Sequence, residues 1–378
     1  MTTVNAKMLG ERIREARKRA DLSQDDVAHL VGIDRTAVNK IEAGSRRVTA
    51  LELADIATAL GVRMTSFFTE PIPALVAHRS SQGLDTSDSQ IDALLARITD
   101  DVEFVAGLDS SEIGLDAGAA AIPDDFAQPT TNAEADTLAA RARRLLGLTA
   151  DEPVRDLSAS VATLGLLAFS RDIGKDTADA GTVLLRRGGV SLVNSHMKVG
   201  RRRLALAHEL GHYLVGDDYT IDWRVARSDD AVPTEARLDR FARALLLPAT
   251  SLTTWSTSVD EQGLRAAAIH IASSYRVDMA TLAARLRELS LADGDAIAAV
   301  REIRTTRADI VEMNLHVPLE ELAGTTVPGP YARAVVRLVR DERISRERGL
   351  ELLHGTFDES DLPQPRTRRS DEIWSFVS

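Results

Sequence analysis

Apolar and polar positions follow helical spacing at the start of the chain. Residues 7–20 combine five basic side chains between Arg12 and Arg19 with apolar ones at helical intervals, namely Met8, Leu9, Ile13 and Ala16. This pattern predicts one amphipathic helix with a cationic face.

Helix-start and helix-stop signals predict three more short helices. Ser23 and Asp26 have the spacing of a capping box, with Asp in the place of the usual Glu, and Gly32 ends that helix. A second helix covers RTAVNKIEAG, and a second capping box, Thr49 with Glu52, opens a third over ALELADIATALGV. Two short helices joined across a glycine predict a helix-turn-helix arrangement.

The helix RTAVNKIEAG, for which Asp34 is the N-cap, is the one that enters the major groove in such an arrangement. Arg and Asn side chains read guanine and adenine, while Thr and Lys more often hold phosphates. The predicted DNA contacts are Arg35, Thr36, Asn39 and Lys40 on this helix, with Arg46 and Arg47 in the loop after it. A helical bundle used only for protein contacts is the alternative.

The stretch LSQDDVAHLVGIDRTAVNKIEAGSRRVTALELADIATALGV resembles the phage-repressor (Xre-type) helix-turn-helix family. The Ser-Gln opening and the Ile-Glu-x-Gly ending match, and the Leu-x-x-Ala-x-x-Leu-Gly type of helix matches loosely. The resemblance implies that residues 1–70 bind double-stranded operator DNA. Because one such domain binds weakly, we expect a homodimer or a second reader.

Residues 71–133 have the composition of a linker. Prolines, a glycine and serines dominate EPIPALVAHRSSQGLDTSDS, although IDALLARITDDVEFVAG has a helical pattern. Residues 71–150 carry a charge of −8, whereas residues 1–70 carry +1. We expect a mostly flexible acidic linker. The alternative is a segment that masks the cationic DNA face or contacts a partner.

Strand patterns precede a second, different helix. LLAFS, TVLLRR and VSLVNS have strand character, with a Gly188-Gly189 turn between the last two. These runs predict a small sheet ahead of RRLALAHELGHYLVGDD, which reads as an apolar helix containing His208, Glu209 and His212. Residues four apart share a helix face, so the two histidines can grip one metal ion, with Glu209 beside them as general base.

A third ligand is needed, because a catalytic zinc has three protein ligands and one open position. The helix TEARLDRFARALLLP offers Glu235 and Asp239 four residues apart on one face. Glu235 would complete a His-His-Glu set, and Asp239 would accept the second ring proton of a zinc histidine. The alternative is a solvated pair of acidic side chains.

The set VSLVN, RRRLALAHELGHYLVGD and ExxxDxFARALLLP resembles the ImmA/IrrE family of zinc metallopeptidases in order and rough spacing. The likeness runs from about Glu134 to residue 289. The family usually has Asn where Asp239 stands and commonly Met where Leu247 stands. The resemblance implies a zinc enzyme that cuts a regulatory partner, and the strand Val190–Asn194 would hold an extended substrate by β-addition.

The C-terminal part shows no catalytic set. VPGPYARAVVRLVRDERISRERGLELLHGTF predicts two helices, the second starting near Ser345. The end, PQPRTRRSDEIWSFVS, is expected to be flexible, and the alternative is that its aromatic residues dock on the body or on a partner.

Length and composition narrow the classes of protein. The chain has 378 residues, which predicts two or three domains, and no cysteine, so any metal must be held by histidines and carboxylates. No apolar run approaches the roughly 18 residues of a membrane span, and the charged N-terminus lacks the core of a signal peptide. We expect a cytoplasmic protein without a membrane partner.

These features predict a multidomain, mainly α protein: an all-α helix-turn-helix domain (1–70), an acidic linker (71–133), an α+β zincin-like metallopeptidase domain with a small sheet (134–290) and a helical C-terminal extension (291–378). The predicted function is a DNA-binding regulator with zinc-dependent endopeptidase activity, cutting a repressor, an antitoxin or itself in a stress or mobile-element response. The alternative is a non-catalytic repressor or antitoxin that uses the zinc-binding fold as a sensor or interaction platform. An intact Glu209 favours the first, because a platform needs no base between its ligands.

Overall fold

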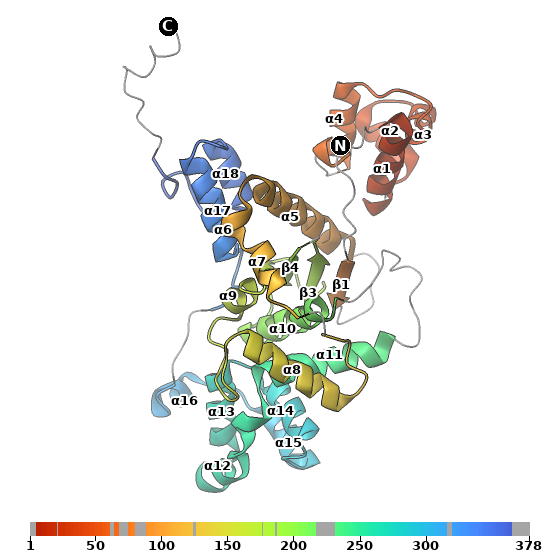
Figure 1. Ribbon diagram of the computed structural model, residues 1–378. Helices are drawn as coiled ribbons and strands as arrows, with labels where there is room; N and C mark the ends of the chain where they lie inside the picture. The colour runs from red at the N-terminus through yellow and green to blue at the C-terminus, as the bar shows by residue number, and fades with distance from the viewer. Residues whose placement is uncertain are drawn as a thin grey trace, which may run out of the picture.

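The computed structural model describes residues 5–20, 22–60, 64–67, 75–79, 88–123, 126–175, 177–185, 187–216, 231–315 and 320–364 (Figure 1). Among these residues, no helix is long and apolar enough to cross a membrane.

The N-terminal part is a small all-helical unit with its own core. It consists of α1 (Ala6–Arg19), α2 (Gln24–Val31), α3 (Arg35–Glu42), α4 (Ala50–Ala59) and the 3-10 turn η1 (Met64–Phe67). Both predicted capping boxes are confirmed, at Ser23 with Asp26 and at Thr49 with Glu52. Gly10 lets α1 meet α3, since a Cβ there would lie 2.4 Å from the Ile41 carbonyl oxygen. The predicted helix-turn-helix arrangement is therefore present.

The larger body holds a four-stranded sheet between helices (Figure 1). Its strands are β1 (Leu75–Arg79), β2 (Leu166–Arg171), β3 (Ala180–Leu184) and β4 (Gly189–Asn194). Its longer helices are α5 (Asp88–Leu108), α8 (Asn132–Leu145), α10 (Val199–Val215), α11 (Ala231–Leu246), α13 (Leu264–Tyr275), α14 (Met279–Glu288) and α17 (Gly329–Arg340). Its shorter helices and turns are α6 (Ser110–Ile113), α7 (Leu115–Ala120), α9 (Leu157–Ala162), η2 (Ala249–Leu252), α12 (Trp255–Gln262), α15 (Gly294–Glu302), α16 (Arg307–Glu312) and α18 (Arg346–Leu352).

The strand order is β1-β3-β4-β2. β3 and β4 form the predicted antiparallel hairpin, whose turn Gly188 closes at a φ of +78°, a conformation that glycine adopts without strain. β4 also pairs with β2, in parallel, along its whole length. The expectation that Val190–Asn194 accepts an added substrate strand is therefore wrong, because both edges of β4 are already paired.

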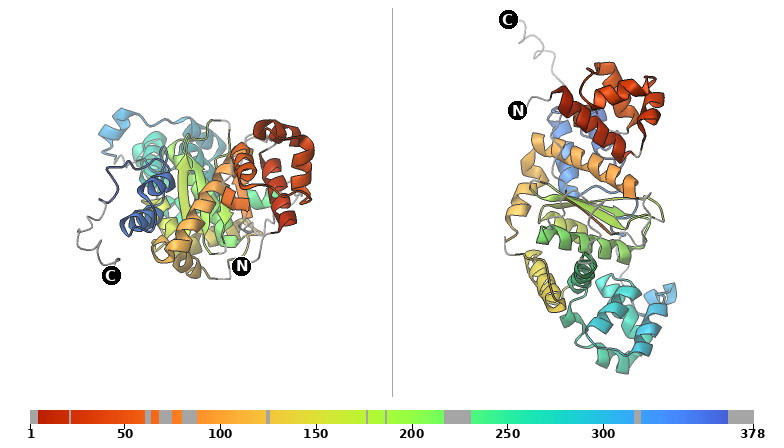
Figure 2. Two further views of the ribbon diagram at one scale, coloured as in Figure 1. Left: turned by 90° about the horizontal axis from the view of Figure 1, so that it is seen from above. Right: turned by 90° about the vertical axis from the view of Figure 1, so that its right-hand side faces the viewer.

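Alternate residues of β2, β3 and β4 face two different cores. Val190 and Leu192 of β4 pack with α5, α17 and α18, whereas Val193 packs with α10 and the helices beyond it. Side chains of neighbouring residues point to opposite faces of a sheet, which explains this division. The right-hand view of Figure 2 shows the resulting layers, with α5 over one face of the sheet and α10 under the other.

Two expectations about the flanking segments need correction. The described part of residues 71–133 is not a flexible linker: β1 joins the sheet, and α5 buries Ile91, Leu95 and Val102 in the core.

The two predicted C-terminal helices, α17 and α18, are confirmed, but they are not an appended extension. They pack with α5 on the face of the sheet opposite α10. Of the end that was expected to be flexible, residues 363–378, all but Pro363 and Gln364 lie outside the described residues.

Glu321 fixes the first turns of α10 from the C-terminal side of the chain. Its carboxylate pairs with the buried guanidinium of Arg203, and its backbone carbonyl accepts a hydrogen bond from Arg202 Nε at 2.9 Å. The same carboxylate accepts a bond from the Ser158 amide at 2.8 Å. Since α9, α10 and the segment before α17 share this residue, α10 is held rigidly beneath the sheet.

Candidate metal centre and nucleic-acid interface

Three side chains on α10 and α11 converge as predicted. His208 Nε2 lies 3.1 Å from Glu235 Oε2 and 3.1 Å from His212 Nε2, and His212 Nε2 lies 3.5 Å from Glu235 Oε1. Four ligands placed tetrahedrally about 2.0–2.1 Å from an ion are about 3.3 Å apart. The three side chains therefore have the chemistry and the spacing to hold one divalent metal ion.

Asp239 sets the orientation of His208. Its Oδ1 lies 2.9 Å from His208 Nδ1, on the side of the ring away from Glu235. The carboxylate favours the tautomer that carries its proton on Nδ1, and this leaves Nε2 as the unprotonated nitrogen that faces the other two ligands. The four-residue spacing of Glu235 and Asp239 predicted that Asp239 contacts one of the two histidines, and that histidine is His208.

The carboxylates also set the charge balance of the group. Burial tends to raise the pKa of Glu235, but hydrogen bonds from His208 and His212 outweigh it and hold that pKa far below its ordinary range. Burial tends to lower the pKa of His208, yet its bonds to Asp239 and Glu235 raise it overall. The three side chains together thus favour a positive charge, such as that of a cation, in the space between their ligand atoms.

Gly211 lets the two ligand-bearing helices approach each other. A Cβ at this position would lie 2.9 Å from Phe241 Cδ1 and 3.2 Å from Leu238 Cδ2. Both of these α11 side chains are fully buried, so they have little room to move. The glycine between Glu209 and His212 is therefore needed for the contact that brings Glu235 to the histidines.

Glu209 is completely buried next to His208 on α10. It lies outside the group of three ligand side chains. Its role as general base stays a prediction from the sequence.

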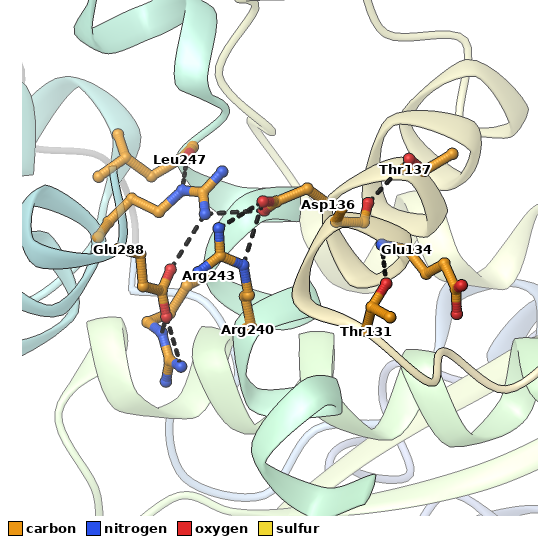
Figure 3. A network of polar contacts seen from close by, with 10 residues as sticks. Thr131, Glu134, Asp136, Thr137, Arg240, Arg243, Leu247 and Glu288 are labelled. Carbon is orange, nitrogen blue, oxygen red and sulfur yellow. Dashed lines mark hydrogen bonds and ion pairs between the residues drawn. The ribbon is translucent and has the colours of Figure 1, made fainter. Parts of the chain in front are cut away.

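A network of ion pairs that the sequence did not predict connects α11 to α8 and α14 (Figure 3). Asp136 of α8 binds Arg240 of α11 at 2.6 Å and Arg285 of α14 at 2.8 Å. Glu288 extends the network to Arg285 at 3.0 Å and to Arg243 at 2.6 Å. Asp136 and Arg240 are 104 residues apart, so no local pattern could signal their pairing.

The predicted DNA contacts on α3 are all solvent-exposed, namely Arg35, Thr36, Asn39 and Lys40. Arg47 is exposed, whereas Arg46 is half-buried and pairs with Glu52 at 2.6 Å. Asn39 Oδ1 accepts a hydrogen bond from Gln24 Nε2 at 3.5 Å, which links its side chain to α2.

Glu42 is the buried acid of this unit. Its carboxylate accepts bonds from Arg17 Nε at 2.6 Å and from Gln24 Nε2 at 2.8 Å. Burial tends to raise the pKa of Glu42, but the bonds from Arg17 and Gln24 outweigh it and lower that pKa. These bonds give a physical reason for the Ser-Gln opening and the Ile-Glu-x-Gly ending, because Gln24 and Glu42 tie α1, α2 and α3 together.

Two family models match the chain. Residues 13–67 match the helix-turn-helix model, and residues 164–287 match the model of the IrrE N-terminal-like domain. The chain is a fusion of these two domains. The helix-turn-helix match spans α3, and the IrrE N-terminal-like match spans β2, β3, β4, α10 and α11 with the metal-ligand group.

Similar proteins align with the helix-turn-helix domain over 62 residues, or 16% of the chain. An uncharacterized transcriptional regulator in the ATPase CF(0) region of Rhodospirillum rubrum is 36% identical, and the chain covers 57% of its length. The control protein C.MunI of Mycoplasma sp. is 34% identical, and the chain covers 84% of it. The crystal structure of the restriction-modification controller protein C.AhdI from Aeromonas hydrophila is 36% identical and covers 17% of this chain and 96% of its own, with a TM-score of 0.17.

Proposed function

We propose that this chain is a DNA-binding regulator whose IrrE N-terminal-like domain is a zinc-dependent endopeptidase. The observation that carries the proposal is the His208, His212 and Glu235 group, with separations of 3.1, 3.1 and 3.5 Å between ligand atoms. Two imidazoles and one carboxylate are a known ligand set of catalytic zinc, which keeps a fourth position open.

When bound, zinc supplies Lewis-acid chemistry, polarising a carbonyl and making a water more acidic. Glu209 takes the proton from the attacking water and returns it to the amine that leaves when the peptide bond breaks. Burial of Glu209 keeps solvent from competing for that proton. Asp239 keeps His208 in the tautomer that presents Nε2 to the ion.

Metal analysis tests the ligand set. Wild type should bind about one zinc ion per chain, and Glu235→Gln should lose most of it, while the exposed α12 carboxylate variant Glu261→Gln should behave as wild type. Equal zinc content in Glu235→Gln and wild type would contradict the assignment.

Turnover needs a separate test, because the ligand group alone also suits a non-catalytic regulator. The proposed substrate is a repressor or antitoxin, or the chain itself. Zinc-loaded protein should cut such a partner in co-expression, and Glu209→Gln should keep its zinc but lose at least about a hundredfold in rate. If no candidate and no self-product is cut while DNA binding persists, the second candidate stands: a repressor or antitoxin that uses the metal-binding fold as a sensor or platform. The similarity of the helix-turn-helix part to a control protein concerns a part that both candidates share.

The exposed face of α3 supports binding of double-stranded DNA through residues 1–70, and we propose a homodimer because one such domain binds weakly.

The operator can be found by selection from random duplexes. Lys40→Ala should weaken binding to all sequences and reduce the salt slope by about one, whereas Asn39→Ala should cost about 1–3 kcal/mol at one base position. Lys18→Ala, an equal charge change at an exposed position of α1, is the control.

A further inference from the structure

β1 comes from a part of the chain that neither family model covers. The helix-turn-helix match ends at residue 67 and the IrrE N-terminal-like match begins at residue 164, while β1 is Leu75–Arg79. The matched domain supplies only β2, β3 and β4. Without β1, its sheet would end at β3, with the outer backbone groups of that strand unpaired.

The two ends of the sheet are closed in different ways. At the β2 end, Ser170 and Thr326 exchange backbone hydrogen bonds of 3.2 and 3.0 Å, which form an isolated antiparallel bridge. At the β3 end, β1 pairs in antiparallel register over five residues, from Leu75 opposite Leu184 to Arg79 opposite Ala180. Within the described residues, the outer edge of β3 is thus the edge that takes a whole added strand.

This edge lies beside the helix that carries the metal ligands. Both β1 and β3 contact α10, and Ala180 of β3 belongs to the same apolar core as Ala205 and Leu206 of α10. Figure 1 shows β1 at the end of the sheet, next to β3. A strand added to β3 is therefore held against α10, the helix that carries His208 and His212.

We propose that the outer edge of β3 is the peptide-docking edge of the IrrE N-terminal-like domain, and that residues 75–79 occupy it in place of a partner's extended segment. Main-chain hydrogen bonds supply the affinity in this mode of recognition and do not depend on side-chain identity. Docking of an extended segment does not require catalysis. Only the hydrolysis of the docked segment rests on the proposed function.

A partner's extended segment and β1 would then compete for the outer edge of β3. β1 has the advantage of being tethered, which gives it an effective concentration of the order of millimolar. Because β1 lies between the helix-turn-helix domain and α5, a partner that displaces it also changes how the DNA-binding domain is attached. Partner capture and DNA binding would then be coupled through five residues.

A disulfide test shows whether β1 occupies this edge in solution. The chain has no cysteine, so Ala77→Cys with Thr182→Cys introduces one pair, at positions that are register partners. Paired antiparallel residues have Cα atoms about 4.5–5.5 Å apart, within disulfide range. Ala77→Cys with Ser191→Cys is the control, because Ser191 lies one strand further, roughly 9.5 Å away. Mild oxidation should bridge the first pair only, and failure to bridge it would overturn the proposal.

A binding test in trans shows whether the edge accepts a peptide. In a Glu209→Gln background, Val76→Pro with Ala77→Pro removes backbone donors from β1 and frees the edge. A fluorescent peptide of residues 73–81 should bind this variant at least tenfold more tightly than the Glu209→Gln parent. Ser80→Pro with Ser81→Pro, just beyond the strand, should behave as the parent, and a peptide carrying the two prolines should not bind.

Equal binding of the peptide to both proteins, or binding to neither, would overturn the proposal. Zinc content and circular dichroism of the proline variant must match those of the parent, which separates loss of the edge from loss of the fold. Neither test uses cleavage of a peptide bond. Failure of the proposed hydrolysis would therefore leave both results unchanged, and failure of docking would leave the zinc and turnover tests unchanged.

Discussion

At the scale of single residues, His208 uses its two ring nitrogens for different tasks. Nδ1 contacts Asp239 and Nε2 faces Glu235 and His212. The sequence predicted that Asp239 would face one of the zinc histidines, because all four side chains sit on two helices at intervals of four residues, but it did not indicate which histidine. The ligand group is the part of the site that the sequence predicts best.

Asp239→Ala should weaken zinc binding by about 10–100-fold, the usual effect of removing the partner of a ligating histidine. Asp239→Asn keeps an oxygen that can accept a hydrogen bond from Nδ1–H and should lose less than about tenfold. Competition with a chelator of known affinity measures both constants. An Asn variant as weak as the Ala variant would show that the charge of Asp239, rather than its hydrogen bond, is what matters.

Glu42 makes the helix-turn-helix domain acid-sensitive. Its pKa in the folded domain lies below the ordinary value of 4.5, so its stabilising effect is complete above that value and is lost as the pH falls through the lowered pKa. Glu42→Gln leaves Arg17 without its charged partner and should cost about 3–5 kcal/mol at pH 7.

Hydrogen exchange of the α1–α4 amides in the whole chain measures that loss. Glu11→Gln, at an exposed position of α1, should leave exchange unchanged. A Glu42→Gln domain as protected as wild type at pH 7 would mean that the buried pair contributes no net stability.

At the scale of elements, helices with clear caps were predictable and their partners were not. Capping boxes and the glycine stop at Gly32 act within four residues, so they can be read locally. The pairing of β1 with β3 joins residues about a hundred positions apart, and acidic composition hid the apolar face of α5. Local periodicity holds no information about which distant element completes a sheet or a core.

Asp136 should control how firmly α11 is held. Asp136→Asn removes the negative charge between Arg240 and Arg285, while Glu288 still pairs with Arg285. We expect a loss of about 2–3 kcal/mol in the free energy of unfolding of the metal-free body, below the full effect of breaking a buried pair. Chemical denaturation followed by circular dichroism measures it, with the exposed variant Glu302→Gln as control. An unchanged midpoint would show that the network does not hold α11.

At the scale of the whole molecule, the two domains have separate cores, so a ligand of one should stabilise only that one. Zinc at a hundred times its dissociation constant should add about 2.7 kcal/mol to the body that holds α10 and α11. Hydrogen exchange with and without a chelator should show this gain in α10 and α11 and none in α1–α4. Equal gains in both parts would mean that the domains unfold as one unit.

The sheet is completed by segments from both ends of the larger body. α5 precedes the strands β2 to β4 and α17 and α18 follow them, yet all three cover the same face, over Leu167, Phe169 and Leu192. During synthesis the helix-turn-helix domain has all the described residues of its core once its own segment has emerged, but this face stays exposed until Tyr331 and Leu338 leave the ribosome. A nascent chain would therefore complete the core of the helix-turn-helix domain before it can finish the larger body.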